Sequence, residues 1–238
     1  MHTLVRFFQM GGLFMFPIAL VLLVGLAIAF ERWVQLKRDR DSNKKMWDLV
    51  YPALVKGEFE KAREMANKDK SSMAQMLGMG LARQGAVRRR EDIEIAMEES
   101  MMEIVPQLEK RTPYLALLSN IATLFGLLGT IMGLIQAFTA VATASPADKA
   151  ALLAASIAEA MNCTAFGLIS AIPLLLLHAR LTTTTGQIVN SMEMASAKAL
   201  NAISNFAKYQ FDPASNDRAP ILSGAKLTGA DHGQTISQ

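Results

Sequence analysis

The 238-residue chain is 51% hydrophobic, and its 24 Lys and Arg against 21 Asp and Glu give a formal net charge of +3. The hydrophobic residues gather in three long runs, which argues against a soluble globular protein. The basic residues flank these runs and alternate with acidic ones, so we expect no nucleic-acid partner. The single cysteine, Cys163, cannot form an intrachain disulfide and is interpreted as a packing residue.

Residues 1–10, MHTLVRFFQM, resemble a short amphipathic helix that lies on the outer face of the membrane that the chain spans. The first uncharged run, 11–30, then has about the twenty residues that cross roughly 30 Å of hydrocarbon. A cleaved signal peptide is the alternative, but the apolar core is long and GLAIAFERW offers no clear small-x-small cleavage site. The sequence therefore favours a first transmembrane helix over residues 11–30.

The segment 31–113 is charged and divides into helical pieces, with Gly57 as a predicted break. Apolar residues recur at helical spacing from Ile93 to Leu108, and this stripe continues almost without pause into the next uncharged run. We therefore expect a long helix that leaves the membrane, with Pro106 and Pro113 as candidate kinks. No strand-like alternation and no internal repeat stand out.

Two further transmembrane helices are predicted at 114–144 and 156–180, joined by a loop at 145–155. A helix is expected over 181–210. The tail, 211–238, is rich in Pro, Gly, Ser, Asn and Asp, and disorder is the default expectation.

Charge placement predicts the orientation, because the loops on the cytoplasmic side of a membrane carry an excess of Lys and Arg. The loop at 145–155 offers only Asp148 and Lys149, whereas Arg180 directly follows the third helix. We thus expect a periplasmic N-terminus, cytoplasmic segments at 31–113 and 181–210, and a cytoplasmic C-terminus. Basic residues crowd the segment after the first helix: Arg32, Lys37, Arg38, Arg40, Lys44 and Lys45.

Small residues line one face of each of the last two helices, at steps of three and four. Such stripes are typical of helix–helix contacts in membranes, because small residues let backbones approach closely. The hydroxyls could bond carbonyl groups of their own helices, or give a surface that slides against a partner. The two stripes are Ser119, Thr123, Gly126, Thr130, Gly133 and Ala137, and Ala160, Thr164, Gly167 and Ala171.

Glu159 is the carboxylate nearest to the core of the span, and Asn162 lies one turn further on. An ionisable group there is a functional candidate, and the alternative is a solvated residue that caps the first turn of the third helix. His178 and Arg180 are interpreted as anchors at the inner end. No Asp, Glu, Lys or Arg occupies the central part of the three helices, so a proton that crosses here needs a carboxylate from another subunit.

Catalysis finds no support, since no metal-ligand cluster and no nucleophile–base motif is present. We therefore predict no enzyme activity and no cofactor.

The sequence resembles the MotA/TolQ/ExbB proton-channel family in two motifs, GLLGTIMGLIQAF and IAEAMNCTAFGLISAIP. A third segment, GGLFMFPIAL…ERW, precedes them and resembles the first helix of the ExbB branch. The resemblance covers residues 11–180, and three membrane helices favour the ExbB/TolQ branch over MotA, which has four. Two departures are Thr123, where relatives often have proline, and Asn162, where the transport branch often has an apolar residue.

The resemblance implies an inner-membrane pentamer around the single helices of an ExbD- or TolR-like partner, whose aspartate carries the proton. It implies that Thr130 and Thr164 line the lumen, and it matches Glu159 to the helix-three glutamate of the family. On this basis Gly126, Gly129, Gly133 and Gly167 are expected to let subunit helices pack closely into a ring.

The function that the resemblance implies is conversion of proton motive force into work across the envelope, as in TonB-type transport. Tol-type envelope constriction, gliding motility, a sodium-driven motor and a non-conducting scaffold ring stay open as alternatives. The further partner that these alternatives imply is a TonB-like, TolA-like or gliding-machinery protein.

Overall fold

The computed structural model describes residues 12–84 and 90–211, so the predicted amphipathic segment 1–10 and the tail from 212 onward lie outside it. Within these ranges every regular element is a helix, which confirms the all-helical prediction. In chain order they are α2 (Met15–Val55), α3 (Phe59–Lys68), α4 (Ser72–Gln84), α5 (Arg90–Glu109), α6 (Thr112–Thr143) and α7 (Lys149–Phe211).

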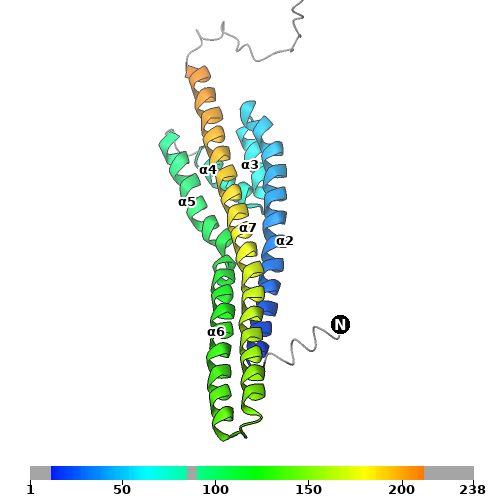
Figure 1. Ribbon diagram of the computed structural model, residues 1–238. Helices are drawn as coiled ribbons and strands as arrows, with labels where there is room; N and C mark the ends of the chain where they lie inside the picture. The colour runs from blue at the N-terminus through cyan, green and yellow to red at the C-terminus, as the bar shows by residue number, and fades with distance from the viewer. Residues whose placement is uncertain (1–11, 85–89, 212–238) are drawn as a thin grey trace, which may run out of the picture.

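Three of these helices are long and apolar enough to cross a membrane, as the sequence predicted. They pack alongside one another as a three-helix bundle, formed by the first half of α2, all of α6 and the first half of α7 (Figure 1). The other ends of α2 and α7 continue beyond the bundle and pack with α3, α4 and α5 as a polar domain. The two parts thus share continuous helices rather than a flexible linker.

The length of α2 and α7 follows from their sequences, which contain few helix-breaking residues. The 41 residues of α2 and 63 of α7 correspond to roughly 60 and 95 Å. Pro17 lies in the first turn of α2, where a missing N–H is tolerated. The helix ends at the predicted break, because Gly57 adopts φ 76°, a conformation that a residue with a Cβ rarely takes.

The predicted continuity between α5 and α6 is interrupted at residues 110 and 111. Arg111 has φ 65°, and Pro113 lies in the first turn of α6. Proline has no N–H to donate to the preceding turn, so the helical hydrogen-bond ladder restarts there. Pro106 is accommodated inside α5. Of the two candidate kinks, Pro113 therefore marks the boundary between two helices.

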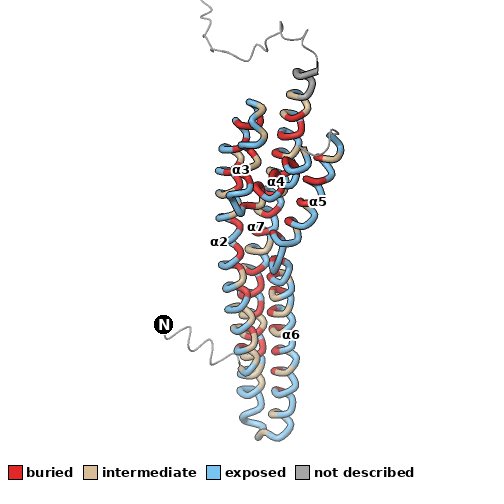
Figure 2. The backbone as a smooth tube through the Cα atoms, turned by 180° about the vertical axis from the view of Figure 1, so that it is seen from behind, coloured by how far each residue is buried: buried red, intermediate tan, exposed pale blue. Residues whose placement is uncertain are grey.

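The core divides in the same way as the fold. The larger buried cluster fills the polar domain and extends into the adjoining part of the bundle, and it is rich in Met, Leu and Ala. A smaller cluster lies deeper in the bundle and consists of Ile18, Ala122, Cys163 and Ala171. Cys163 thus packs as an apolar residue, and Figure 2 shows how buried positions thin out toward the loop between α6 and α7.

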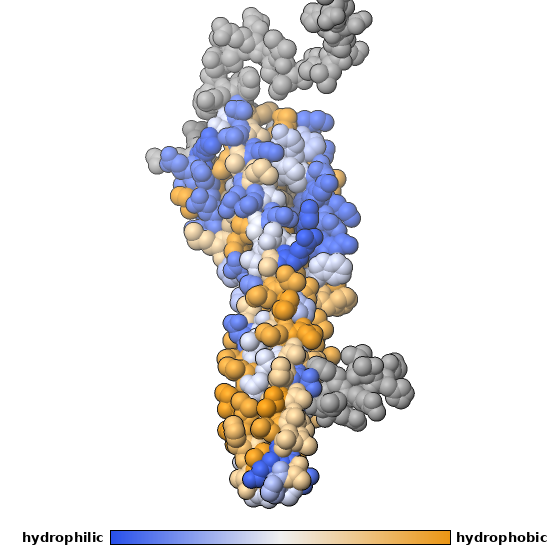
Figure 3. All heavy atoms as spheres, viewed as in Figure 1, coloured by the Kyte–Doolittle hydropathy of each residue, from blue (hydrophilic) through white to orange (hydrophobic). Residues whose placement is uncertain are grey.

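The bundle presents a broad apolar surface, visible in Figure 3 as the orange lower half below the blue polar domain. Only 22% to 33% of the residues in the most apolar windows of the three spanning helices are buried inside the chain. Leu124, Phe138 and Leu176 are among the exposed side chains. Such a surface needs lipid or further apolar helices to cover it.

Candidate functional site

Small residues bring α6 and α7 into close antiparallel contact. A Cβ atom added to Gly167 would lie 3.0 Å from the Cα atom of Gly126, and one added to Gly133 would lie 2.8 Å from the Cβ atom of Ala160. A Cβ atom on Gly129 would collide with the Cys163 side chain. The four predicted packing glycines therefore contact a helix of their own chain, and a contact with a second subunit stays a prediction.

The buried face of α6 differs from the predicted stripe. Thr123 is exposed and Thr130 is half-buried, while Ala122 and Gly129 occupy the contact with α7 beside Gly126. The two helices approach most closely where the side chain is a methyl group or a hydrogen atom, and threonine is too large for those places. The expectation that both threonines share the buried face with the glycines is therefore wrong for Thr123, which is exposed, whereas Thr130 is only half-buried.

Two hydroxyl groups join α6 to α7 within the apolar region. Thr164 donates to the carbonyl oxygen of Gly126 at 2.8 Å, and Ser119 donates to the carbonyl oxygen of Ala171, also at 2.8 Å. The sequence left open whether Thr164 bonds its own helix, and it gave Ser119 only as a member of the small-residue stripe. Glycines bring two helix backbones close together, so a hydroxyl near such glycines can reach a carbonyl group of the other helix. This pattern could have indicated the bond from the sequence.

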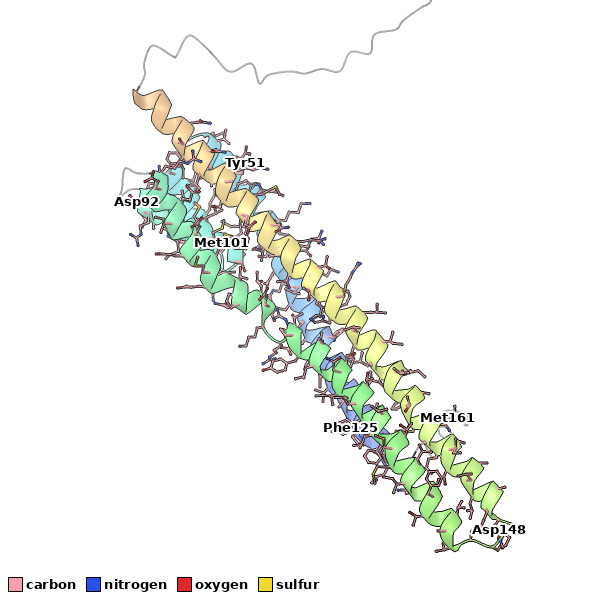
Figure 4. All side chains as sticks on the ribbon, turned by 60° about the vertical axis from the view of Figure 1, so that its left-hand side comes forward. Tyr51, Asp92, Met101, Phe125, Asp148 and Met161 are labelled. Carbon is pink, nitrogen blue, oxygen red and sulfur yellow. The ribbon has the colours of Figure 1, made fainter. Side chains whose placement is uncertain are left out.

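Thr130 is placed differently from Thr164. Its hydroxyl donates to the carbonyl oxygen of Leu127 in its own helix at 2.6 Å, and the side chain is half-buried. Thr130 lies one turn, about 6 Å along the axis, from the level at which Thr164 meets Gly126. The two predicted lumen threonines are therefore close in height, but of the two only Thr164 donates a hydrogen bond from one helix to the other. Figure 4 places Phe125 and Met161 in the same part of the bundle.

Glu159 lies against the beginning of α2. A Cβ atom on Gly12 would collide with its carboxylate oxygen, and the glutamate is half-buried. The helix that carries it begins at Lys149, so Glu159 is in the third turn of α7. The alternative that Glu159 caps the first turn of the helix is therefore wrong, because the unpaired N–H groups lie at the helix start. Asn162, also half-buried, follows one turn later.

The middle of the bundle is free of side chains that carry a charge at neutral pH. Ala160 to Leu177 contains 18 residues without Asp, Glu, Lys, Arg or His, a length of about 27 Å. Glu159 and His178 lie at the two ends of this stretch, and its length is close to the thickness of the hydrocarbon core. Nor do the described residues contain a group of three or more His, Cys, Asp or Glu that could hold a metal ion.

A buried arginine ties α2 to the junction between α5 and α6. The guanidinium of Arg32, 2% exposed, donates to the carbonyl oxygen of Leu108 and also to Gln35. Burial lowers the pKa of this guanidinium, although nearby Asp39 and Glu31 oppose the shift. Beside it, Arg111 and Glu31 form an ion pair of 2.6 Å with about half of each side chain exposed. The sequence did not distinguish Arg32 from the neighbouring basic residues.

These features define a multi-pass membrane protein whose three spanning helices hold no charge at mid-depth. The family model described as the MotA/TolQ/ExbB proton channel family matches residues 68–194, slightly more than half of the chain. The chain therefore belongs to the MotA/TolQ/ExbB proton channel family, in its ExbB/TolQ branch.

Individual relatives carry the names of both systems in that branch. The Tol-Pal system protein TolQ of Haemophilus influenzae is 38% identical over 86 residues, which cover 36% of this chain and 37% of the relative. The biopolymer transport protein ExbB-like 1 of Synechocystis sp. is 30% identical over 175 residues, covering 69% and 65%. TolQ of Pseudomonas aeruginosa is 29% identical over 132 residues, covering 56% and 50%. The chain thus spans between about a third and two thirds of the length of these three relatives.

Proposed function

We propose that the chain is the channel subunit of a proton-driven motor. Five copies form a ring around the single membrane helices of an ExbD- or TolR-like partner, and proton motive force does work across the envelope. The number of copies and the kind of partner come from the family resemblance. The polar domain is cytoplasmic in this proposal, since basic residues crowd the part of α2 that leaves the bundle.

One observation carries the proposal: hydroxyl groups lie in a bundle whose middle holds no charged side chain, so the chain offers no proton carrier of its own there. Thr130 and Thr164 place hydroxyls in the apolar region, and Glu159 lies at its loop end. A hydroxyl is a neutral and weak partner for a passing carboxylic acid, whereas a lysine would hold the carboxylate ionised. A partner carboxylate supplies the missing carrier, with Asn162 as a further polar group near its entry.

Proton flux in liposomes tests the proposal. The chain is purified alone and with its co-expressed partner, and a pH-sensitive dye reports flux under an imposed membrane potential. We expect flux only from the complex, and loss of flux when the membrane carboxylate of the partner is changed to its amide. A stable complex that conducts no protons and supports no proton-driven work would leave the scaffold ring as the function. Replacing the proton gradient with a sodium gradient tests the sodium-driven alternative directly.

Orientation has a separate test. In a Cys163→Ala background, a cysteine at position 45 should resist an impermeant thiol reagent in intact cells and react after lysis. Labelling in intact cells would place the polar domain outside and reverse the proposed direction of proton entry.

Tol-type envelope constriction is the second candidate, because two of the relatives are Tol-Pal system proteins. A deletion strain separates the systems. Loss of energised uptake across the outer membrane supports TonB-type transport, loss of envelope constriction supports the Tol type, and loss of surface movement supports gliding. The same motor chemistry serves all three.

A further inference from the structure

The polar domain carries opposite charge on its two flanks. Figure 1 shows α7 between α5 on one side and the upper part of α2 on the other, with the three helices alongside one another at the same height. The 20 residues of α5 include seven acidic side chains and one basic one. The facing stretch of α2 instead contributes exposed basic residues, among them Arg40 and Lys44.

A hollow of about 680 Å³ lies between α5 and α7. Its charged lining consists of Glu94, Glu98 and Glu193, and it contains no basic side chain. Its apolar lining includes Met101, labelled in Figure 4 on α5, and the 74% exposed Met102. Methionine side chains adapt readily to a partner surface. We call this hollow the acidic groove.

A second hollow, of about 660 Å³, lies between α2 and α7 on the opposite flank. Arg40, Lys44 and Lys198 line it with a single carboxylate, Asp41, and its apolar lining includes the 59% exposed Met194. We call it the basic groove. Its size and apolar content match those of the acidic groove, while its charge is opposite.

The charges that line the two grooves are not used inside the chain. The ion pairs among the described residues are Lys61–Glu58, Lys68–Glu64 and Arg111–Glu31, and none of them involves either groove. Exposed charges of one sign around an apolar hollow are suited to a partner surface of the other sign.

We infer that the acidic groove of one copy binds the flank of the next copy that carries the basic groove. This inference rests on the proposed ring assembly and names the surface that closes it. All copies in one bilayer lie at the same depth and point in the same direction. When an axis along the membrane normal relates them, surfaces at the same height on neighbouring copies therefore face each other. A contact between two different patches of identical chains generates a ring when the rotation closes. The α5 flank of each copy then contacts the α2–α7 flank of its neighbour, and the exposed ridge of α7 faces the axis.

Charge reversal with rescue tests the contact. One variant combines Glu94→Lys with Glu98→Lys, a second combines Arg40→Glu with Lys44→Glu, and a third carries all four changes. Native mass spectrometry in detergent at low salt measures the oligomer distribution. We expect each two-residue reversal to lower the apparent association constant at least about tenfold, because like charges then face each other. The four-residue variant, in which opposite charges meet again, should recover most of the assembly.

The control variant combines Glu60→Lys with Glu64→Lys on α3, which changes net charge equally but away from both grooves. It should assemble like the natural chain. High salt should narrow the difference between the natural chain and the reversed variants, since charges at a partly exposed contact are screened.

Crosslinking of the unmodified protein gives a second measurement. A carbodiimide joins a carboxylate to an amine in direct contact, and a mixture of isotope-labelled and unlabelled copies identifies links between chains. We expect links from Glu94 or Glu98 to Lys44 or Lys198. A ring that persists in the reversed variants and lacks these links would overturn the inference and leave the proposed function intact. A monomer in both detergent and lipid nanodiscs would overturn both.

Discussion

Thr164 on α7 donates its hydroxyl hydrogen to the main-chain carbonyl oxygen of Gly126 on α6, at 2.8 Å. The bond joins the two helices at the level where Gly126 and Gly167 bring their backbones together. The threonine therefore has a structural role inside one chain besides the lumen role that the family resemblance implies. A substitution at this position affects packing and conduction at once.

Thr164→Val should lower the free energy of unfolding by about 0.5–1.5 kcal/mol, because the bond between helices is lost. Thr164→Ser retains the hydroxyl and should recover most of this loss. Thermal unfolding in detergent measures both. Thr139→Val is the matched control, since Thr139 is exposed on α6 and its hydroxyl bonds its own helix at Ile135. Equal stability of the valine variants at 164 and 139 would contradict the structural role.

Gly167→Ala should destabilise the chain by about 1–3 kcal/mol through overpacking. The added methyl group would lie 2.9 Å from the carbonyl oxygen of Ala122, and the backbone there cannot move aside cheaply. Gly186→Ala is the control, because a Cβ atom at Gly186 meets nothing within 4 Å. That second change should stabilise α7 by about 0.5–1 kcal/mol, the difference in helix propensity. Thermal unfolding should therefore shift in opposite directions for the same chemical substitution.

The sequence predicted the helical class and the three spanning helices because uncharged runs of about twenty residues have few other uses. It also predicted a helix break at Gly57, where φ is 76°. The break at Arg111 was harder to predict from the sequence, because the nearby Pro113 is compatible with a kink, with a first helical turn or with a boundary between helices. Which of these occurs depends on the packing of α5 against the polar domain.

The candidate site was predictable in composition but not in geometry. Periodicity placed Thr130 on the same face as Gly133, yet the buried line continues from Gly133 through Gly129 and Ala122, because contact distance selects the smallest side chains. The start of α7 at Lys149 could not be read from hydropathy, and with it the position of Glu159 inside the helix. Arg32 was one basic residue among several, and only the tertiary contact with Leu108 separates it from them.

Arg32→Ala should lower the free energy of unfolding by about 2–4 kcal/mol. The change leaves the Leu108 carbonyl group without its donor and opens space in the core between α2 and α5. Glu31→Gln, which breaks the half-exposed pair with Arg111, should cost less than about 1 kcal/mol. Thermal unfolding of the two variants compares a buried with an exposed charge at the same junction. A similar loss in both would mean that the Arg32 contact contributes no more than a surface pair.

Thr130→Val should separate conduction from folding. The hydroxyl bonds Leu127 within its own helix rather than a group on α7, so the free energy of unfolding should change by less than about 1 kcal/mol. If Thr130 faces the partner's carboxylate, proton flux of the reconstituted complex should fall well beyond that of Thr139→Val. Co-purification of the partner shows whether the complex still forms. Normal flux in an intact complex would remove Thr130 from the proposed path.

Glu159→Gln tests charge at the loop end of the bundle without a change in shape. The residue lies in the third turn of α7 beside Gly12, too far from the helix start to act as a cap. A charge that is merely solvated there should contribute under about 1 kcal/mol, with flux unchanged. A carboxylate that passes protons toward the partner must bind and release them, which the amide cannot do. We therefore expect flux to fall while unfolding and partner co-purification stay close to those of the natural chain.

Asn162→Ala, one turn away, is the comparison variant: a smaller loss of flux than in Glu159→Gln assigns the effect to the titratable group. Full flux in the Glu159→Gln complex would show that the proton enters by another route.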